Sequence, residues 1–197
     1  MKWMGITGSI GSGKSTVATL VGEMGFPVIR ADEVSRQMTS KGSKGLDQIE
    51  KHFGQSLISD DGELDRAALS KLVFGNTAEL KILEGILHPL IQAHVRNWRE
   101  DQEQKGYSMA FYDIPLLFEN KLQSNFDSVI CVVADEEHIL ERVKSRSGLA
   151  EDEIRKRLSH QVPVAEKVKQ SDHVIENNGS MEELKTKVKD LLAELGN

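Results

Sequence analysis

Short apolar runs alternate with apolar stripes at helical spacing in the first forty residues. Lys2–Thr7 is mostly apolar and runs directly into glycines, which predicts a buried strand. Ser15–Met24 has apolar residues every three or four positions and is followed by Gly25, so we expect a helix that ends there. Pro27–Arg30 is expected to form a second short strand. A strand, a helix and a strand in this order make a βαβ unit, which implies a parallel sheet.

The next stretch, residues 42–106, shows helical patterns and no convincing strand. Asp65–Phe74 is expected to form one helix. Over Leu80–Trp98 the apolar residues recur at three- and four-residue steps, the stripe of a long helix or a helix pair. Pro89 interrupts this stripe, and we expect it to kink or restart the helix near His88 because proline lacks the backbone N–H that a helix needs. We interpret the region as a helical insertion that docks on the sheet.

Strands resume in the second half of the chain, at Ser108–Asp113, Ser128–Ala134 and His173–Glu176. The middle one is continuously apolar, as expected for a strand that is buried on both faces. Helices are expected at Glu136–Ser147, at Glu151–Gln161, from Pro163 onward and at Met181–Leu195.

Residues 8–15 read Gly-Ser-Ile-Gly-Ser-Gly-Lys-Ser and meet the G-x-x-x-x-G-K-[ST] pattern of a phosphate-binding loop. Its glycines permit backbone angles that other residues avoid, so successive N–H groups can face an anion at the positive end of the next helix. Lys14 adds a mobile positive charge for the β- and γ-phosphates, and the hydroxyl of Ser15 suits Mg²⁺. We expect ATP to bind through Gly11, Ser12, Gly13, Lys14, Ser15 and Thr16.

These elements predict an α/β fold, a P-loop NTPase three-layer sandwich with a parallel sheet of about five strands. We expect a single domain over residues 1–197, with a core made of residues 1–41, 108–139 and 171–197. A helical insertion that binds the acceptor is expected at about residues 42–107, and a helical lid at about residues 140–170.

Composition narrows the function. A net charge of −6 argues against a general nucleic-acid binder, which usually has a basic surface. The single cysteine, Cys131, lies in an apolar run, so we expect a buried core thiol and no intramolecular disulfide. A strand-like segment begins within a few residues of Met1, so no signal peptide is expected. No apolar stretch reaches the ~18–20 residues that cross a bilayer, and we expect a cytoplasmic protein without a membrane partner.

A phosphate loop by itself leaves three classes open: a small-molecule kinase, a guanine-nucleotide switch, and an ATPase motor or nucleotide-dependent binding module. A switch protein carries an Asn-Lys-x-Asp guanine reader near a late strand. The candidate here, residues 177–180, reads Asn-Asn-Gly-Ser and lacks the lysine and the aspartate. A motor generally needs a longer chain and more surface for partners. The length of the chain, its helical insertion and a basic late segment suit a small-molecule kinase best.

Two carboxylates follow strands, at the edge where parallel sheets bind ligands. Asp32 comes directly after the second strand, where it can accept the proton of an attacking hydroxyl or simply cap a helix. Asp113 ends the third strand in chain order. That place suits a Walker-B-like contact to Mg²⁺ behind Ser15, and it equally suits a turn residue.

Residues 140–170 hold eight basic and five acidic residues, a net charge of +3 in a chain of −6. A basic helical segment after the fourth strand is typical of a lid that closes over phosphates and brings in arginine. Arg142 and Arg146 stand four apart and share one helix face, so we expect these two to face the phosphates. Most of the other charges are expected to be solvated.

Several segments, in collinear order, carry a resemblance to a known family. They are Gly5-Ile6-Thr7 with the phosphate loop and Thr16, Ala31-Asp32, Leu87-His88-Pro89-Leu90-Ile91, Asp113-Ile114-Pro115-Leu116-Leu117-Phe118-Glu119, Arg142 with Arg146, Gln161, and Val174-Ile175 with Asn177-Asn178-Gly179. In these segments the chain resembles the dephospho-CoA kinases, the last enzymes of coenzyme A biosynthesis. The resemblance covers nearly the whole chain, and its His-Pro and Pro-Leu-Leu-Phe-Glu segments are the most specific.

The resemblance implies transfer of the ATP γ-phosphate to the ribose 3′-hydroxyl of dephospho-CoA, with Mg²⁺. It implies catalytic roles for Asp32, Lys14 and Arg142 and further ATP contacts from Arg146 and Asn177, the last on the adenine side. It places Pro115, Leu116 and His88 toward the acceptor, although His88, beside a proline, equally suits packing or capping. Ser15 and Asp113 are the implied metal residues, with Ser15 the more secure.

One departure concerns Arg30, which stands where the family usually has a second aspartate in an Asp-Ala-Asp triplet. Asp32 is therefore the sole carboxylate at that strand end, and no paired carboxylate is expected to bind Mg²⁺ there. The alternatives are a nucleoside or nucleotide kinase of the same fold and a nucleotide-dependent binding module. The oligomeric state stays open.

Overall fold

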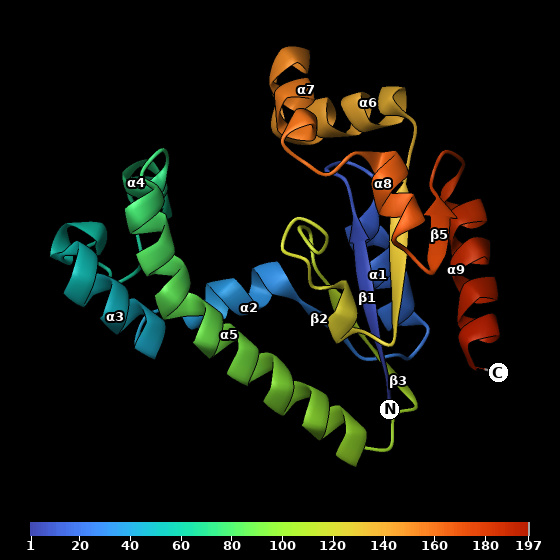
Figure 1. The fold of residues 1–197 in the computed structure, drawn as a ribbon, viewed down its shortest axis with the longest axis horizontal. Helices are drawn as coiled ribbons and strands as arrows, with labels where there is room; N and C mark the ends of the chain where they lie inside the picture. Colours follow the sequence, from blue (N-terminus) through green and yellow to red (C-terminus); the bar gives the residue numbers. More distant parts are fainter. Residues whose placement is uncertain (197) are drawn as a thin grey trace. The chain divides into compact units, whose positions relative to one another are not determined.

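The structure is a computed structural model that describes residues 1–196. Five strands form one parallel sheet in the order β2-β3-β1-β4-β5 (Figure 1). Their bounds are β1 Lys2–Gly8, β2 Val28–Arg30, β3 Met109–Asp113, β4 Ser128–Val133 and β5 His173–Glu176. The predicted α/β fold with a parallel sheet of about five strands is confirmed.

Helices separate the strands along the chain. They are α1 Lys14–Glu23, α2 Ala31–Met38, α3 Lys44–Phe53, α4 Arg66–Val73, α5 Thr77–Gln104, α6 Glu136–Ser147, α7 Glu151–Ser159, α8 Val164–Lys169 and α9 Met181–Gly196, with short 3₁₀ turns η1 Gln55–Leu57 and η2 Gln123–Asn125. The chain divides into two compact units. The first holds residues 1–31 and 102–197, and the second holds residues 32–101.

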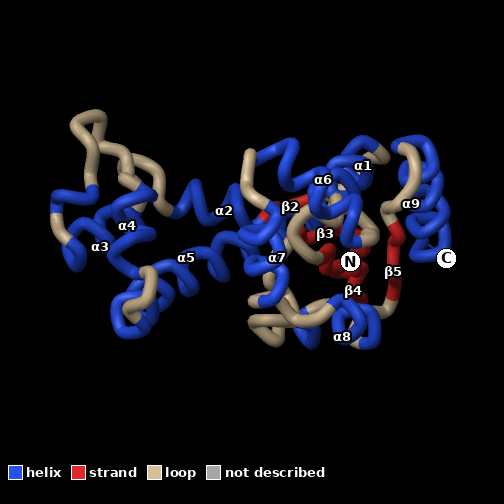
Figure 2. The backbone as a smooth tube through the Cα atoms, turned by 90° about the horizontal axis from the view of Figure 1, so that it is seen from above, coloured by secondary structure: helices blue, strands red, loops and turns tan. Residues whose placement is uncertain are grey.

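In the first unit the sheet is covered on both faces. Side chains of α1 and α9 pack with one face of β1, β3, β4 and β5 in a single apolar cluster. A second cluster, around Leu117, Phe118 and Val129, covers part of the other face, where α8 also lies (Figure 2). Phe111 of β3 is fully buried in the first cluster, which contributes about 1.5–3 kcal/mol relative to an exposed ring. These layers confirm the predicted three-layer sandwich.

The parallel register brings the carboxyl ends of the strands to one edge. Ile6 of β1 lies opposite Asp113 of β3, and Gly8 lies opposite Val132 of β4. Val133 of β4 pairs with Glu176 of β5. The segments of the first unit that follow β1, β3, β4 and β5 therefore begin at the same edge of the sheet. Parallel sheets bind their ligands at this edge.

Strand β4 also contains the single cysteine, Cys131. Cys131 is free and fully buried, as predicted. Burial raises the pKa of this thiol, which keeps it protonated and unreactive. No helix among residues 1–196 has both the length and the apolar character of a membrane span.

The second unit is helical. Its core gathers Leu46, Ile49, Leu57, Leu64 and Leu69, and α5 adds Leu83, Ile86 and Leu87 to it. Ser43 caps α3 by accepting a hydrogen bond from the N–H of Leu46 at 3.2 Å, and Asp65 caps α4 by accepting one from Ala68 at 2.9 Å. The described part of this unit holds no strand, as predicted, only one isolated bridge between Ile58 and Leu64.

Pro89 does not restart the long helix, so that part of the prediction is wrong. Helix α5 runs unbroken over 28 residues with Pro89 inside it. His88 and Pro89 are both exposed. A proline inside a helix costs about 3 kcal/mol, and the burial of the apolar stripe on the same helix offsets it.

Candidate active site

The phosphate loop joins β1 to α1. Gly8 is the last residue of β1, and Lys14 is the first residue of α1. Gly11 and Gly13 have φ angles of 76° and 94°, the left-handed region that side chains avoid. The loop therefore adopts the turn that lets consecutive N–H groups face an anion at the start of α1.

Close neighbours restrict the loop further. A Cβ atom at Gly8 would collide with the carbonyl oxygen of Val132 on β4, and one at Gly13 would collide with the side-chain amide of Asn177. The N–H of Ile10 donates to Oε1 of Gln161 at 3.1 Å. Residues that are distant in the sequence thus lie in contact with the loop.

Lys14 is held by a carboxylate of the sheet. Its Nζ lies 2.9 Å from Oδ1 of Asp113, and the two side chains are only 11% and 4% exposed. Asp113 ends β3, next to β1, so the pairing follows from the strand order. The structure thereby brings together the two residues that the sequence placed at separate strand ends. Asp113 therefore forms an ion pair with Lys14 and is not only a residue at the end of a strand.

A metal ion at this edge would find few ligands from the protein. No group of three or more His, Cys, Asp or Glu side chains in the described chain could hold one. The residues do offer the exposed hydroxyl of Ser15 beside the loop and the carboxylate of Asp113. Mg²⁺ prefers oxygen ligands, keeps several waters and binds substrate phosphates, so this sparse oxygen set fits it.

Arg142 and Arg146 both lie on α6, as predicted, but in different surroundings. Arg142 is partly buried, and its Nη2 donates to the backbone carbonyl of Asn177 at 2.9 Å. Its Nη1 is buried and has no hydrogen-bond partner among the described residues. Arg146 is exposed and makes no hydrogen bond or ion pair with the described chain. Both guanidinium groups therefore have donors to spare for an anion.

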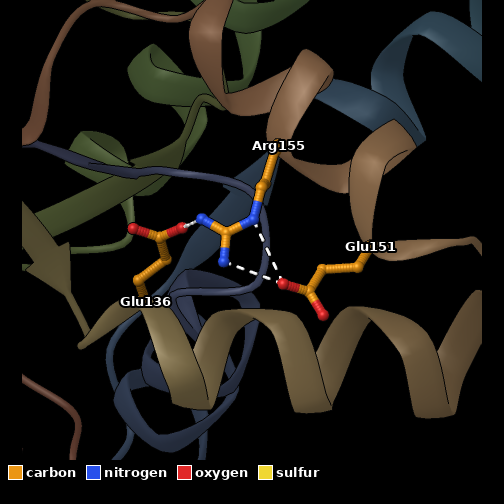
Figure 3. A network of polar contacts seen from close by, with 3 residues as sticks. All are labelled: Glu136, Glu151 and Arg155. Carbon is orange, nitrogen blue, oxygen red and sulfur yellow. Dashed lines mark hydrogen bonds and ion pairs between the residues drawn. The ribbon is translucent and has the colours of Figure 1, made fainter.

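The other charges of the basic segment serve different purposes. Arg155 of α7 pairs with Glu151 on its own helix at 2.8 Å and with Glu136 of α6, so it joins the two helices (Figure 3). Lys167 of α8 is not solvated, contrary to our expectation for most of these charges. Its side chain is fully buried and lies 2.9 Å from Oε1 of Glu119.

Glu119 connects several parts of the first unit. The same Oε1 accepts a hydrogen bond from the N–H of Val162 at 2.9 Å, next to Gln161. Burial by itself raises the pKa of Glu119, but Lys167 and the backbone N–H groups of Glu119 and Val162 outweigh it, and the pKa is lowered. Its pairing with Lys167 is a feature that sequence reasoning missed, since nothing local marks a lysine as buried.

The segment after Asp113 forms a turn. Ile114 and Leu117 are buried, while Pro115 is half-buried and Leu116 is 43% exposed. The buried pair anchors the turn in the apolar cluster of the second sheet face. Pro115 and Leu116 are thereby presented at the carboxyl edge of the sheet, next to the residue that holds Lys14.

Asp32 and His88 belong to the second unit. Asp32 is the second residue of α2, which begins at Ala31, so it does not cap the helix as the alternative interpretation held. Its carboxylate is exposed and has no partner among the described residues. Along the chain it stands two residues after Arg30, whose guanidinium donates to Thr19 of α1 at 3.1 Å. His88 is exposed on α5.

A parallel sheet, a complete phosphate loop at its carboxyl edge and arginines on the helix after β4 define a P-loop kinase. The family model for dephospho-CoA kinase matches residues 2–183. The chain belongs to the dephospho-CoA kinase family.

Individual relatives agree. A dephospho-CoA kinase of Bdellovibrio bacteriovorus is 42% identical over 178 residues, which cover 90% of this chain and 88% of that protein. The crystal structure of TT1252 from Thermus thermophilus has a TM-score of 0.84 at 36% identity, over 98% of this chain and 97% of its own. The dephospho-CoA kinase from Campylobacter jejuni has a TM-score of 0.74 at 28% identity, over 98% and 96%.

Proposed function

We propose that this protein transfers the γ-phosphate of ATP to the ribose 3′-hydroxyl of dephospho-CoA and releases coenzyme A and ADP. The observation that carries the proposal is the phosphate loop with its lysine held on Asp113 at 2.9 Å, in a chain of this family. The family supplies the acceptor, and the loop supplies the place of the donor. Cytoplasmic location remains part of the proposal.

The donor half uses residues 11–16 together with Arg142 and Arg146. The loop N–H groups bind the β-phosphate, and Lys14 leaves Asp113 to contact the β- and γ-phosphates. Ser15, and indirectly Asp113, would hold Mg²⁺, which would neutralise phosphate charge. The guanidinium groups of α6 add positive charge where it builds up during transfer.

The transfer needs a positioned hydroxyl more than covalent chemistry. The ribose oxygen attacks the γ-phosphorus while the bond from that phosphorus to the β–γ bridging oxygen breaks. Asp32 accepts the proton of the attacking hydroxyl, a role that its carboxylate allows, since it is exposed and has no partner within residues 1–196. ADP then leaves with the bridging oxygen.

The acceptor half draws on Pro115, Leu116 and His88. We propose that the turn of Pro115 and Leu116 contacts the acceptor, because Leu116 is an exposed apolar side chain on a firmly anchored turn. We also propose that the helical insertion at about residues 42–107 binds the CoA-like part and that residues 140–170 act as the lid. His88, exposed on α5, is available for substrate contact.

The test is a coupled assay of ADP release with ATP, Mg²⁺ and dephospho-CoA, with chromatographic detection of coenzyme A as product. We expect turnover with dephospho-CoA and at most trace turnover with nucleosides or nucleoside monophosphates. Comparable rates with those acceptors would point to a nucleoside or nucleotide kinase. ATP binding without transfer to any CoA precursor would point to a nucleotide-dependent binding module.

A further inference from the structure

Asn177 lies at the junction of three elements of the first unit. It follows β5 directly, is 7% exposed, and its N–H donates to the carbonyl of Val133 on β4 at 2.8 Å. Its side-chain Nδ2 donates to the backbone carbonyl of Ser12 at 2.9 Å. Its own backbone carbonyl accepts from Nη2 of Arg142 at 2.9 Å. The backbone N–H, the backbone carbonyl and the side-chain Nδ2 of Asn177 thus all form hydrogen bonds within the protein.

The bond to Ser12 acts on the anion-binding face of the loop. The carbonyl of Ser12 and the N–H of Gly13 belong to one planar trans peptide, so they point in opposite directions. Fixing the carbonyl toward Asn177 therefore turns the N–H of Gly13 away from Asn177, to the open side of the loop. The amide of Asn177 also occupies the space that a Cβ of Gly13 would need. This contact gives Gly13 a second reason to be glycine, besides its φ of 94°.

The bond to Arg142 acts on the lid. It uses Nη2, while Nη1 of the same guanidinium is buried without a partner among the described residues. A buried unpaired donor is costly unless a ligand completes it. Asn177 therefore holds both the loop peptide and the lid arginine, with one side-chain and one backbone bond.

We propose that Asn177 is a positioning residue for the triphosphate: it orients the Ser12–Gly13 peptide and the Arg142 guanidinium, and does not read the adenine. This inference rests on the proposed function only in taking the loop as the ATP phosphate site. It differs from an adenine contact because the donor of the side chain, Nδ2, is already bonded to the backbone carbonyl of Ser12.

The experiment compares two probes, Mg²⁺–ATP and Mg²⁺–tripolyphosphate, which has no base. Affinities are measured by calorimetry without acceptor, so failure with dephospho-CoA would not affect the result. Asn177→Ala removes the donor, and Asn177→Asp replaces it by a carboxylate that repels the Ser12 carbonyl. Both affinities should fall by the same factor, about 5- to 20-fold for Asn177→Ala and more for Asn177→Asp.

The matched control is Asn178→Asp. It adds the same charge one residue away and keeps the oxygen that accepts the N–H of Asp135 at 2.8 Å. Its affinities should stay within about twofold of the wild type. If Asn177 variants lose ATP affinity while tripolyphosphate affinity is unchanged, Asn177 contacts the base and the proposal is wrong. A lower melting temperature with both affinities unchanged would show a merely structural role and would equally overturn it.

A wild-type measurement keeps the test decisive if the variants fail to fold. In ¹⁵N-labelled protein, tripolyphosphate should shift the Gly13 backbone amide and the Asn177 side-chain amide together, and adenosine should shift neither. Shifts of the Asn177 side chain with adenosine alone, or no shift with tripolyphosphate, would contradict the positioning role.

Discussion

The ion pair of Lys14 with Asp113 shows how a single carboxylate prepares a lysine for phosphate. Both side chains are almost fully buried, at 11% and 4% exposure. Burying two charges carries a large desolvation cost, which the attraction between them must offset. Burying one charge without its partner is strongly unfavourable. Asp113 thus holds the side chain of Lys14 in place, and we expect the phosphates of ATP to replace it as the counter-charge.

Replacing Asp113 by Asn tests this role. The change keeps the shape but removes the charge that faces Lys14. We expect kcat to fall by at least about 10-fold and the Mg²⁺ concentration for half-maximal rate to rise, because we propose that the carboxylate also supports the metal. Steady-state kinetics over a Mg²⁺ series measure both. If the variant had the kinetics of the wild type, Asp113 would have neither role and would be only a turn residue.

Asp32 is the residue that we propose as the proton acceptor. Asp32→Asn should lower kcat by ~10²–10⁴-fold, the usual contribution of a general base, while ATP affinity stays nearly intact. Glu33→Gln, the adjacent acid in the same turn of α2, is the control and should keep kcat within about twofold. An unchanged kcat in Asp32→Asn would leave Asp32 only the favourable charge of a first helical turn.

At the scale of elements, two neighbouring residues hold the connection between α7 and α8 in place. Gln161 holds the N–H of Ile10 in the phosphate loop, and Val162 binds Glu119. Glu119 in turn pairs with Lys167 of α8. A path of polar contacts therefore leads from the loop to the turn after β3 and on to α8.

The pair of Glu119 and Lys167 should behave as a buried ion pair. Glu119→Gln leaves the fully buried Lys167 without its counter-charge and should cost about 3–5 kcal/mol of unfolding free energy. The double variant Glu119→Gln with Lys167→Met should recover most of that loss, since no charge is left buried. Urea unfolding of both variants measures this. A double variant as unstable as the single one would contradict the explanation.

The same pair predicts a pH dependence. The pKa of Glu119 is lowered in the folded state, so the unfolded chain binds the proton more readily. The stability from Glu119 is present above the ordinary glutamate pKa and is lost as the pH falls through the lowered value. The difference in melting temperature between the wild type and Glu119→Gln should therefore be constant from pH 6 to 7 and shrink below about pH 4.5. A difference independent of pH would exclude this linkage.

Helices α6 and α7 carry two kinds of arginine. Arg155 is half-exposed and pairs with Glu136 and Glu151, an arrangement worth at most about 1 kcal/mol (Figure 3). Arg142 keeps a buried donor that has no partner in the described part of the chain, and another donor of the same side chain, Nη2, contacts Asn177. Arg155→Met should leave kcat/KM within about twofold, whereas Arg142→Met should lower it by at least about 100-fold. A loss in Arg142→Met no larger than that in Arg155→Met, in the same ADP-release assay, would show that Arg142 has no special role in the transfer.

At the scale of the whole molecule, the residues that we propose for binding and catalysis fall in both compact units of the chain. The phosphate loop, Asp113 and Arg142 lie in the first unit, and Asp32 and His88 lie in the second. The residues that we propose for ATP all lie in the first unit, so ATP binding can be tested by a substitution there.

Thermal shift assays should separate the two substrates. A ligand at 100 times its Kd stabilises the folded state by about 2.7 kcal/mol. Mg²⁺–ATP should raise the melting temperature of the wild type, and Lys14→Ala should abolish that shift while keeping the shift caused by dephospho-CoA. Loss of both shifts in a folded Lys14→Ala protein would show that the acceptor binds only after ATP.

Local pattern was enough for the phosphate loop, the strands and most helices. The loop needs glycines, a lysine and a serine at fixed spacing within eight residues, and the strands are short apolar runs. Where local rules competed with packing, prediction failed: helix α5 continues through Pro89, since partly buried apolar residues of this helix pack on the helical core. The start of α2 at Ala31 likewise moved Asp32 from a cap into the first turn.

Sequence by itself therefore determined the fold class, the phosphate loop and the family, because each depends on residue types at short spacing or in collinear order. Only the tertiary structure decided which distant groups meet. It paired Lys14 with Asp113, buried Lys167 against Glu119, and brought Asn177 to Ser12 across 165 residues. Such contacts depend on strand order and on how helices pack over the sheet, and no local pattern of charge or hydrophobicity encodes them.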